Sequence, residues 1–344
     1  MARTRARRQV YADLLERYGR SVADAFLRAI DSLRSAAEVA RLTAAIEAGQ
    51  IEEALDALHI DPEAFNEVAD RLRDAHAESG RATAEAMPRR SSDGTALVVR
   101  FDGRNPEAEA WLARQSSDLI TRLTEEQRQI VREAITEGMR RGQNPRQTAL
   151  DLVGRINRVT GKRVGGVLGL SGPQAEYVQS ARDELASSDP AVMRNYLTRQ
   201  RRNKQFDRSV AKAIREARAV DRVIAARAVT AYETQLLRLR GETIAKHETF
   251  AALEAAKEQA FRQAVASGKI AETAVTKTWR HFSSRNPRHQ HIVMDGQKVG
   301  LNGFFIMPDG TVMQYPHDPA APVRHTAGCL CQADYSIDFY AGLT

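Results

Sequence analysis

The chain has 344 residues, and 51 Lys and Arg against 44 Asp and Glu give it a formal net charge of +7. Hydrophobic residues make up 42% of the sequence and charged residues 28%, which excludes a chain that is disordered throughout. No stretch approaches the roughly 18 uninterrupted apolar residues that a bilayer span requires, so we expect no membrane partner. The length favours two or three domains.

The sequence has two cysteines, Cys329 and Cys331, separated by one residue. So few cysteines exclude a secreted scaffold that is stapled by several disulfides. The opening residues, MARTRARRQV, are rich in arginine and lack the apolar core of a signal peptide, so we expect no export by that route. A reducing compartment, or a metal site built on thiolates, fits the two cysteines better.

Helical periodicity dominates the first part of the chain. Apolar residues recur at three-to-four spacing from Val10 and Leu14 onward, and they predict amphipathic helices to about Ala86. Residues 87–94 (MPRRSSDG) combine Pro, Ser and Gly, which predicts a loop. Residues 96–101 (ALVVRF) contain β-branched side chains and predict one short strand.

Three helix starts are signalled in the middle of the chain. Asn105-Pro106 and Asn144-Pro145 each place a capping side chain before a proline in the first turn. Thr124 with Gln127 three positions later has the spacing of a capping box, which predicts a third start. A long helical pattern then runs from residue 232 to about residue 267.

The segment 161–172 (GKRVGGVLGLSG) carries many glycines, which could free backbone N–H groups to bind a phosphate. It lacks the GKS or GKT ending of a phosphate loop, and no strand is expected before it. We therefore expect a flexible loop between helices, ending at Ser171 before a helix that starts at Pro173.

The most basic part of the sequence lies between Arg199 and Arg222, where we expect a helical basic face. Such a run is usually a solvated surface. It could also contact the phosphates of double-stranded DNA or an acidic patch on a partner protein. The candidate nucleic-acid-binding residues are Arg199, Arg201, Arg202, Lys204 and Arg208.

The composition changes after Val275. Five of the eight histidines, both cysteines and five of the eleven prolines fall there, and the helical periodicity ends. Short β-type runs at 303–307 and 312–315 flank the turn at 308–310 and predict a hairpin. A domain of fewer than about 70 residues has a thin core and often needs a metal or a neighbour to hold it together.

The Cys-Leu-Cys run is the first candidate for chemistry. A disulfide within it would be strained, because the geometry of a disulfide is narrow. Two thiolates and two imidazoles make a natural zinc site, so we expect the two cysteines to converge with His291. The alternative is a pair of buried thiols with histidines that face solvent. The candidate metal ligands are His291, His317, Cys329 and Cys331, with His325 or His281 as alternatives to His317.

His289-Gln290-His291 next to Asp295 could instead belong to a hydrolase, with histidine as general base and the carboxylate as metal ligand. Nothing else in the sequence supplies the second half of such a site. We therefore assign no catalytic residue and expect no enzymatic activity. A metal-dependent nucleic-acid-binding protein or hydrolase, using the His and Cys residues of the C-terminal domain, is the alternative.

Short elements recur in order toward the C-terminus. Lys277 and Trp279 form a K.W element, Arg288 to Gly296 an R..H..M.G element, and Cys329 and Cys331 a closing CxC. With an upstream helix of the form R..tiA.tE, these elements resemble the phage Mu F-like head morphogenesis, or minor head protein, family over residues 105–338. The residues that match the family motifs are Arg240, Glu248, Lys277, Trp279, Arg288, His291, Gly296, Cys329 and Cys331.

The resemblance implies a minor capsid protein of a tailed phage, a prophage or a related particle, which acts in head morphogenesis. It implies a place in the virion, inside the head near the portal, after assembly in the host cytoplasm. A role in DNA packaging or ejection would follow. The implied partners are the portal protein, the major capsid or scaffold protein, and double-stranded DNA.

Together, these patterns predict a mainly α protein with multi-helix N-terminal and middle blocks and a small α+β C-terminal domain. The expected domains are an N-terminal helical region at 1–104, a middle helical domain with the basic stretch at 105–275, and a small α+β Mu F-like domain at 276–344.

Overall fold

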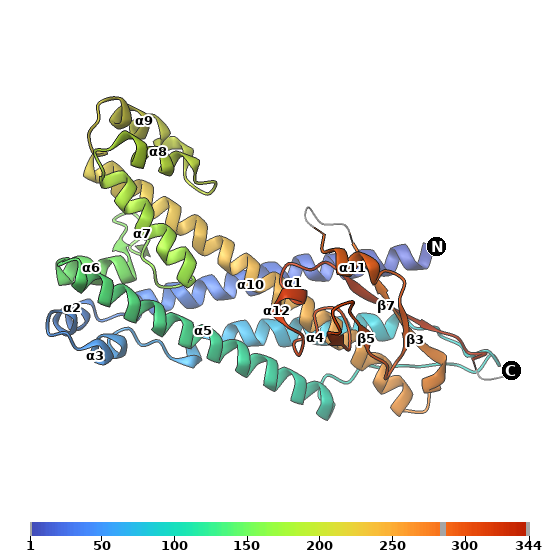
Figure 1. The fold of residues 1–344 in the computed structure, drawn as a ribbon. Helices are drawn as coiled ribbons and strands as arrows, with labels where there is room; N and C mark the ends of the chain where they lie inside the picture. Colours follow the sequence, from blue (N-terminus) through green and yellow to red (C-terminus); the bar gives the residue numbers. More distant parts are fainter. Residues whose placement is uncertain (1, 283–286, 342–344) are drawn as a thin grey trace. The chain divides into compact units, whose positions relative to one another are not determined.

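The computed structural model describes residues 2–282 and 287–341, and Figure 1 shows their helices and strands. Helices make up most of the chain before Val275, and the longer strands follow it, which confirms the predicted fold class. The long helices are α1 (Ala2–Ala36), α4 (Asn66–Glu85), α5 (Pro106–Arg140), α7 (Gly172–Ala186) and α10 (Arg222–Ala266). The shorter helices are α2 (Val39–Glu47), α3 (Ile51–Asp56), η1 (Pro62–Phe65), α6 (Pro145–Val153), α8 (Pro190–Thr198), η2 (Lys204–Phe206), α9 (Asp207–Arg215), η3 (Glu272–Ala274), α11 (His289–Val293) and α12 (Val323–Thr326). The strands are β1 (Arg155–Ile156), β2 (Arg163–Val164), β3 (Val275–Arg280), β4 (Lys298–Gly300), β5 (Phe305–Ile306), β6 (Val312–Met313) and β7 (Gln332–Ile337).

The chain divides into two compact units, and each is built from separate stretches of sequence. Unit 1 comprises Met1–Ala23, Val68–Asp118 and Glu242–Thr344, and unit 2 comprises Asp24–Glu67 and Leu119–Gly241. Helices α1, α4, α5 and α10 contribute residues to both units. The three consecutive domains expected from the sequence stay a prediction, because a grouping by contacts does not test which segments fold alone.

The predicted helix starts at the two Asn-Pro pairs are confirmed. Asn105 accepts a hydrogen bond from a backbone N–H in the first turn of α5, and Asn144 does the same for α6. Ser171 and Gln174 form a capping box at the start of α7, where the sequence predicted that a helix would begin.

Thr124 lies inside α5, so the helix start predicted there is wrong. Its side chain is buried, and the helix continues through it without interruption. Gln127 accepts a hydrogen bond from the N–H of Gly169 at 2.6 Å and donates one to the carbonyl of Leu170 at 3.0 Å. The Thr-x-x-Gln spacing therefore reflects a tertiary contact within unit 2.

Residues 165–170 of the glycine-rich segment are buried, whereas Gly161 and Lys162 are exposed. The segment does connect α6 to α7, but a loop that is flexible throughout was the wrong expectation. Leu168 and Leu170 are fully buried. The Arg34 guanidinium donates to the carbonyls of Gly166 and Leu168 at 3.1 Å and 2.6 Å. A Cβ on Gly166 would lie 2.4 Å from the backbone nitrogen of Gly154, so glycine permits two backbone segments to touch here.

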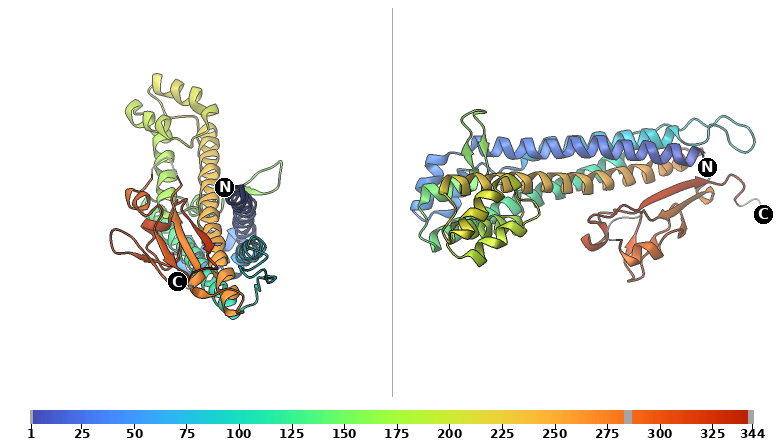
Figure 2. Two further views of the ribbon diagram at one scale, coloured as in Figure 1. Left: turned by 90° about the vertical axis from the view of Figure 1, so that its right-hand side faces the viewer. Right: turned by 90° about the horizontal axis from the view of Figure 1, so that it is seen from above.

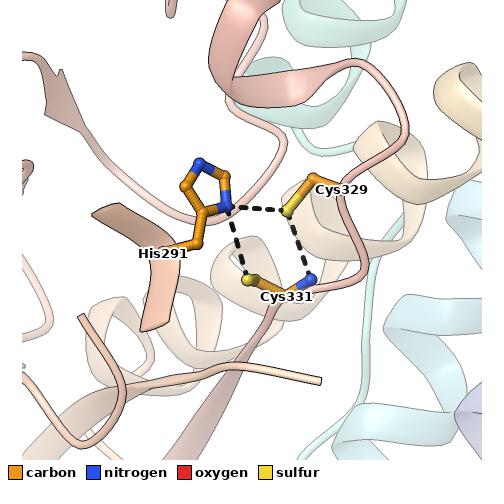
Figure 3. A group of neighbouring side chains, drawn as sticks. All are labelled: His291, Cys329 and Cys331. Carbon is orange, nitrogen blue, oxygen red and sulfur yellow. Dashed lines mark hydrogen bonds between the residues drawn. The ribbon is translucent and has the colours of Figure 1, made fainter. Parts of the chain in front are cut away.

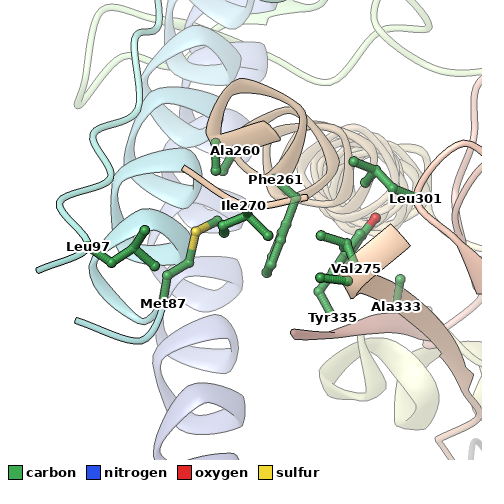
Figure 4. Close-up of a cluster of buried hydrophobic side chains, with 11 residues drawn as sticks. Met87, Leu97, Ala260, Phe261, Ile270, Val275, Leu301, Ala333 and Tyr335 are labelled. Atoms are coloured by element: carbon green, nitrogen blue, oxygen red, sulfur yellow. The ribbon is translucent and has the colours of Figure 1, made fainter. Parts of the chain in front are cut away.

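The predicted strand at 96–101 is wrong. Its only β contact among the described residues is an isolated bridge between Arg90 and Ala96. The apolar side chains are nevertheless used, because Leu97 is buried with Met87 in a cluster that also contains Phe261 of α10 (Figure 4). The β-branched run therefore marks burial against helices, and no neighbouring strand among the described residues pairs with it.

A three-stranded antiparallel sheet forms the β part of unit 1. β3 is central, with β4 on one side and β7 on the other, and Figure 2 shows β3 and β7 lying side by side. One face of the sheet packs on α10, where the ring of Tyr335 stacks on Phe261 with centroids 4.7 Å apart. The docked face is mainly apolar, as expected for a sheet that is covered on one side, but it also carries the buried Lys277.

The predicted hairpin is confirmed, although its strands are shorter than the sequence suggested. β5 and β6 pair antiparallel, with Phe305 opposite Met313. In the turn, Asp309 accepts a hydrogen bond from the N–H of Thr311, and Gly310 has a φ of +83°. A positive φ explains why glycine occupies that position.

None of the helices in residues 2–282 and 287–341 combines the length and the apolar character that a bilayer crossing requires.

His76 of α4 lies in the core of unit 1. Its side chain is fully buried, and its ring stacks on Trp111 of α5 with centroids 5.4 Å apart. Burial lowers the pKa of His76 to about 4, and the neighbouring Gln259 offsets only part of this effect. The imidazole is therefore neutral in the folded protein at neutral pH.

We expect His76 to make the free energy of unfolding depend on pH. Between about pH 6.5 and pH 4 the unfolded chain binds a proton at His76 that the folded chain does not bind, so stability falls as pH falls. The loss should reach about 3 kcal/mol at 1.36 kcal/mol per pKa unit. Urea unfolding of the His76→Phe variant at pH 7 and pH 4 should show a correspondingly smaller loss. The exposed His289→Gln variant is the control, and equal losses in all three proteins would contradict the assignment.

Candidate metal centre

His291, Cys329 and Cys331 converge in unit 1, as the sequence predicted (Figure 3). The Nδ1 atom of His291 lies 3.3 Å from Sγ of Cys329 and 3.6 Å from Sγ of Cys331. All three donor atoms lie within 4.8 Å of one another, and the three residues are 2%, 4% and 1% exposed. Three soft donors this close can hold a metal ion.

Local backbone structure presents these donors. The short helix α11 carries His291, and Arg288 just before α11 donates a hydrogen bond to the carbonyl of Ala327. That bond joins α11 to the segment that carries the cysteines. The N–H of Cys331 donates to Sγ of Cys329 at 3.3 Å, which folds the CxC run so that both sulfur atoms face the imidazole.

The two thiols share their environment and ionise unequally. A hydrogen bond from Cys331, together with the neighbouring imidazoles of His291 and His317, lowers the pKa of the Cys329 thiol strongly. The hydrogen bond to Cys329, together with burial, raises the pKa of the Cys331 thiol. The first proton therefore leaves this pair easily, and the second is retained unless a cation compensates the charge.

Three further histidines surround the cluster. Nδ1 of His281 lies 3.6 Å from Sγ of Cys331. Nδ1 of His325 lies 3.4 Å from Nε2 of His291, and its own Nε2 lies 2.8 Å from a carboxylate oxygen of Asp309. Within the described chain, His281, His325 and His317 all lie outside the set of mutually close donors. His281 nevertheless approaches one sulfur atom directly. His325 is placed to orient the His291 ring through Nε2, the nitrogen that does not face the sulfur atoms.

His317, the fourth ligand that the sequence favoured, lies outside that close set. It is buried, adopts a φ of +68° and stacks on Phe250 of α10 with ring centroids 4.4 Å apart. Neither of its ring nitrogens makes a well-aligned hydrogen bond among the described residues. A buried imidazole without a hydrogen-bond partner is unusual and carries a desolvation cost.

An apolar shell surrounds the cluster. Trp279 of β3 meets the His291 ring edge-on, with centroids 5.7 Å apart, and it also contacts Phe305 of β5. Methionines 294, 307 and 313 belong to the same buried cluster as the two cysteines. The shell keeps water away from the sulfur atoms, which protects thiolates and strengthens any interaction with a cation.

Lys277, the lysine of the K.W element, is fully buried and has a clear structural role. Its ammonium lies 3.1 Å from a carboxylate oxygen of Glu258 on α10, and it donates to the carbonyl of Gln314 at 2.8 Å. Tyr335 donates its hydroxyl to Glu258 at 2.6 Å, and Arg262 pairs with the same carboxylate at 3.0 Å. Burial lowers the pKa of Lys277, and the charge of Glu258 works against that effect.

Sequence reasoning missed Glu254 and Glu258, which are both almost fully buried on α10. Glu254 accepts a hydrogen bond from the backbone N–H of Ala333 in β7 at 3.0 Å. The available signal was their spacing of four residues, which places both carboxylates on one face of a helix otherwise rich in alanine.

The other motif residues are structural and lie away from the sulfur atoms. In unit 2, Arg240 donates to the carbonyl of Gly169 at 2.8 Å and pairs with Glu126 at 2.7 Å. In unit 1, Glu248 is buried and accepts a hydrogen bond from Gln115 at 2.6 Å. Gly296 has a φ of +85° and donates its N–H to the carbonyl of Trp279, closing the turn between α11 and β4.

The basic stretch of unit 2 does not form one helical face. It begins just after α8, contains the short η2 and α9 with loops around them, and ends at the first residue of α10. Arg199 forms a bidentate pair with Glu184 at 2.7 Å, and Arg202 pairs with Asp207 at 2.9 Å. Their charges are therefore used within the unit. The candidates left exposed are Arg201, Lys204 and Arg208.

His289 and Asp295, the residues of the hydrolase alternative, do not join the cluster among the described residues. His289 is exposed at the start of α11, and Asp295 accepts a hydrogen bond from the backbone N–H of His281 at 3.0 Å. Asp295 thus holds the backbone that follows β3.

No family model matches this chain, and no solved structure gives a significant match. The chain is similar to a curated protein of Bacillus subtilis (strain 168) that is described as "Uncharacterized protein YqbB". The two are 32% identical over 107 residues, which cover 30% of this chain and 33% of that protein. The chain therefore matches about a third of the length of this relative, whose description names no activity or partner.

We expect the buried pair of Lys277 and Glu258 to be sensitive to the loss of one partner. Lys277→Met leaves the buried Glu258 carboxylate without its fully buried cation and with Arg262 alone, so unfolding free energy should fall by about 3 kcal/mol. The double variant Lys277→Met with Glu258→Gln should recover most of that loss, because the amide can still accept from Tyr335 and carries no charge. Denaturant unfolding of the four proteins measures the coupling. Additive effects would show that the pair is not coupled.

Proposed function

We propose that this chain is a minor head protein of a tailed phage, a prophage or a related particle, and that it acts in head assembly near the portal. The observation that carries the proposal is the meeting of motif elements that lie far apart in sequence. Trp279 of the K.W element, His291 of the second element and the two cysteines of the third element pack together. Motifs that form one buried centre support a true resemblance over a chance match of short patterns.

The character of this centre supports a structural role. Its donors are almost fully buried, and the carboxylate of the neighbouring Asp309 is hydrogen-bonded to His325. The proposed partners are the portal protein and the major capsid or scaffold protein. Such a chain would stand inside the head near the portal after assembly in the host cytoplasm.

We propose zinc as the ion of the metal centre. Zinc binds sulfur at about 2.3 Å and imidazole nitrogen at about 2.0–2.1 Å, so tetrahedral S and N ligands lie about 3.6 Å apart. The observed separations of 3.3 Å and 3.6 Å between the imidazole nitrogen and the two sulfur atoms fit that spacing. His281 or His317 would supply the fourth donor. Bound zinc would neutralise the thiolates and fix the two ends of the C-terminal region to each other.

Zinc should be measurable in the purified protein. We expect about one zinc per chain by elemental analysis, and chelation should lower the melting temperature substantially, because structural zinc can supply about 10 kcal/mol of folding free energy. Cys329→Ser should lose the zinc, whereas the exposed His289→Ala should retain it. His281→Ala and His317→Ala, compared with each other, identify the fourth ligand. Absence of zinc together with an unchanged melting curve would refute the metal centre.

The assembly role can be tested in particles. Deleting the gene from the phage or prophage that encodes the chain should give heads with reduced DNA content or reduced infectivity. Complementation with the intact chain should restore both properties, and complementation with Cys329→Ser should not. Heads of normal DNA content and infectivity after deletion would contradict the proposal.

We also propose that the exposed basic residues of unit 2 contact packaged DNA. Changing Arg201, Lys204 and Arg208 to Ala should weaken binding to duplex DNA. It should also reduce the salt dependence of log K by about 0.9 for each phosphate that the variant no longer neutralises. The matched control changes Arg20, Arg73 and Lys269, which are exposed elsewhere, and removes the same charge. Equal effects of the two triple variants would show that DNA binding depends only on net charge, and this would contradict the proposed contact.

A further inference from the structure

The outer edge of β7 offers unused backbone hydrogen-bonding groups. The N–H and carbonyl of Trp279 in β3 bond to Gln297 and Gly296, on the side of β4. Trp279 therefore does not bond to Ala333, the residue opposite it in β7. Backbone groups alternate in direction along an antiparallel strand, so those of Ala333, Tyr335 and Ile337 point away from β3.

Part of this edge is already covered. Glu254 of α10 accepts from the N–H of Ala333 at 3.0 Å, and Lys257 donates to its carbonyl at 2.9 Å. The N–H and carbonyl of Tyr335 and of Ile337 have no such partners in the described part of the chain. Two residues thus present two donors and two acceptors in the spacing that an extended chain can match.

A groove of about 820 Å³ runs along this edge within unit 1. All six residues of β7 line it on one side. On the other side lie Tyr11 and Leu14 of α1, Ala82 of α4 and Met87 after α4. In Figure 4, Met87 faces Phe261 from the side opposite the strand that carries Tyr335. The volume lies in the range of sites that enclose a small ligand or a few residues.

The charged residues of the groove favour an acidic ligand. Four basic side chains line it, against the two acidic side chains of Glu85 and Asp334, and one of the four, Lys257, is paired with Glu254 of α10 at 2.6 Å. Asp334 is paired with Arg280 at 3.2 Å. Arg89 and Lys298 are exposed, and they form no ion pair among the described residues. The basic side chains that line the groove are Arg89, Lys257, Arg280 and Lys298.

We propose that the free edge of β7 binds an extended acidic segment of a partner protein by strand addition. Hydrogen bonds to the backbone of Tyr335 and Ile337 would hold the segment in place. Side chains of the added strand would alternate between two surroundings. One set would face α1 and α10, where the groove is apolar. The other set would lie on the polar side of the sheet, beside Arg280 and Lys298. The segment would therefore alternate apolar and acidic residues.

Synthetic peptides of six residues, the length of β7, provide the probe. Fluorescein-labelled peptides that alternate valine with glutamate, or valine with lysine, are titrated with the full chain and followed by fluorescence anisotropy. We expect the glutamate peptide to bind and the lysine peptide to bind at least about tenfold more weakly, because its charges meet basic side chains. Equal binding of both peptides, or no binding of the glutamate peptide, would overturn the proposal.

Backbone methylation of the peptide distinguishes strand addition from attraction by charge alone. Two isomers of the glutamate peptide are N-methylated, one at its odd residues and one at its even residues. Only one set of amides faces β7, so one isomer should lose about tenfold or more in affinity and the other should bind nearly as well as the parent. Equal affinities of the two isomers would refute pairing with β7.

Two measurements on the protein complete the test. Hydrogen exchange of the Tyr335 and Ile337 amides should slow when the glutamate peptide is bound, and unchanged exchange would count against pairing at this edge. Arg89→Glu should weaken binding by about tenfold, whereas Arg90→Glu, next to it but outside the groove, should not. Equal effects of the two variants would argue against the groove. Strand addition here does not depend on the proposed role in a phage head.

Discussion

The C-terminal part of unit 1 depends on one buried carboxylate. Glu258 of α10 accepts hydrogen bonds from Lys277 of β3, Tyr335 of β7 and Gln314 of the segment after β6. A buried carboxylate is costly unless its charge is compensated and its oxygens are hydrogen-bonded. Only one placement of the sheet on α10 brings all these donors to the same side chain, so the network fixes the register as well as the contact.

That placement also positions the candidate metal-binding cluster. Lys277 and Trp279 stand two residues apart on β3, so their side chains lie on the same face of the strand. Fixing Lys277 on Glu258 therefore directs Trp279 toward His291 and the cysteines. The K.W element is explained physically, because the lysine anchors the strand to the helix and the tryptophan shields the sulfur atoms.

The sequence predicted what depends on local pattern and on ligand chemistry. Proline with a capping side chain marked the starts of α5 and α6, and the CxC run with a nearby histidine marked the cluster. Thr124 misled because a capping spacing inside a helix looks the same as one at its start. His317 was favoured as the fourth ligand from its position between prolines, but its placement depends on stacking with Phe250, which lies 67 residues earlier. Contacts of that kind have no local signature.

The burial of Glu254 and Glu258 could not be predicted from the local sequence either. In an alanine-rich helix, Glu254 and Glu258 resemble solvated residues, and only the strand that covers them reveals their role. The two glutamates bind different parts of β7. Glu254 accepts a hydrogen bond from the backbone of Ala333, and Glu258 accepts one from the side chain of Tyr335. Cys331 immediately precedes this strand. The beginning of β7 is therefore held by the His291, Cys329 and Cys331 cluster and by α10 together, whereas the outer backbone groups of β7 beyond Ala333 have no partner among the described residues. Rigid anchoring at one end and unused hydrogen-bonding groups at the other are what an edge strand needs to accept another chain without unfolding.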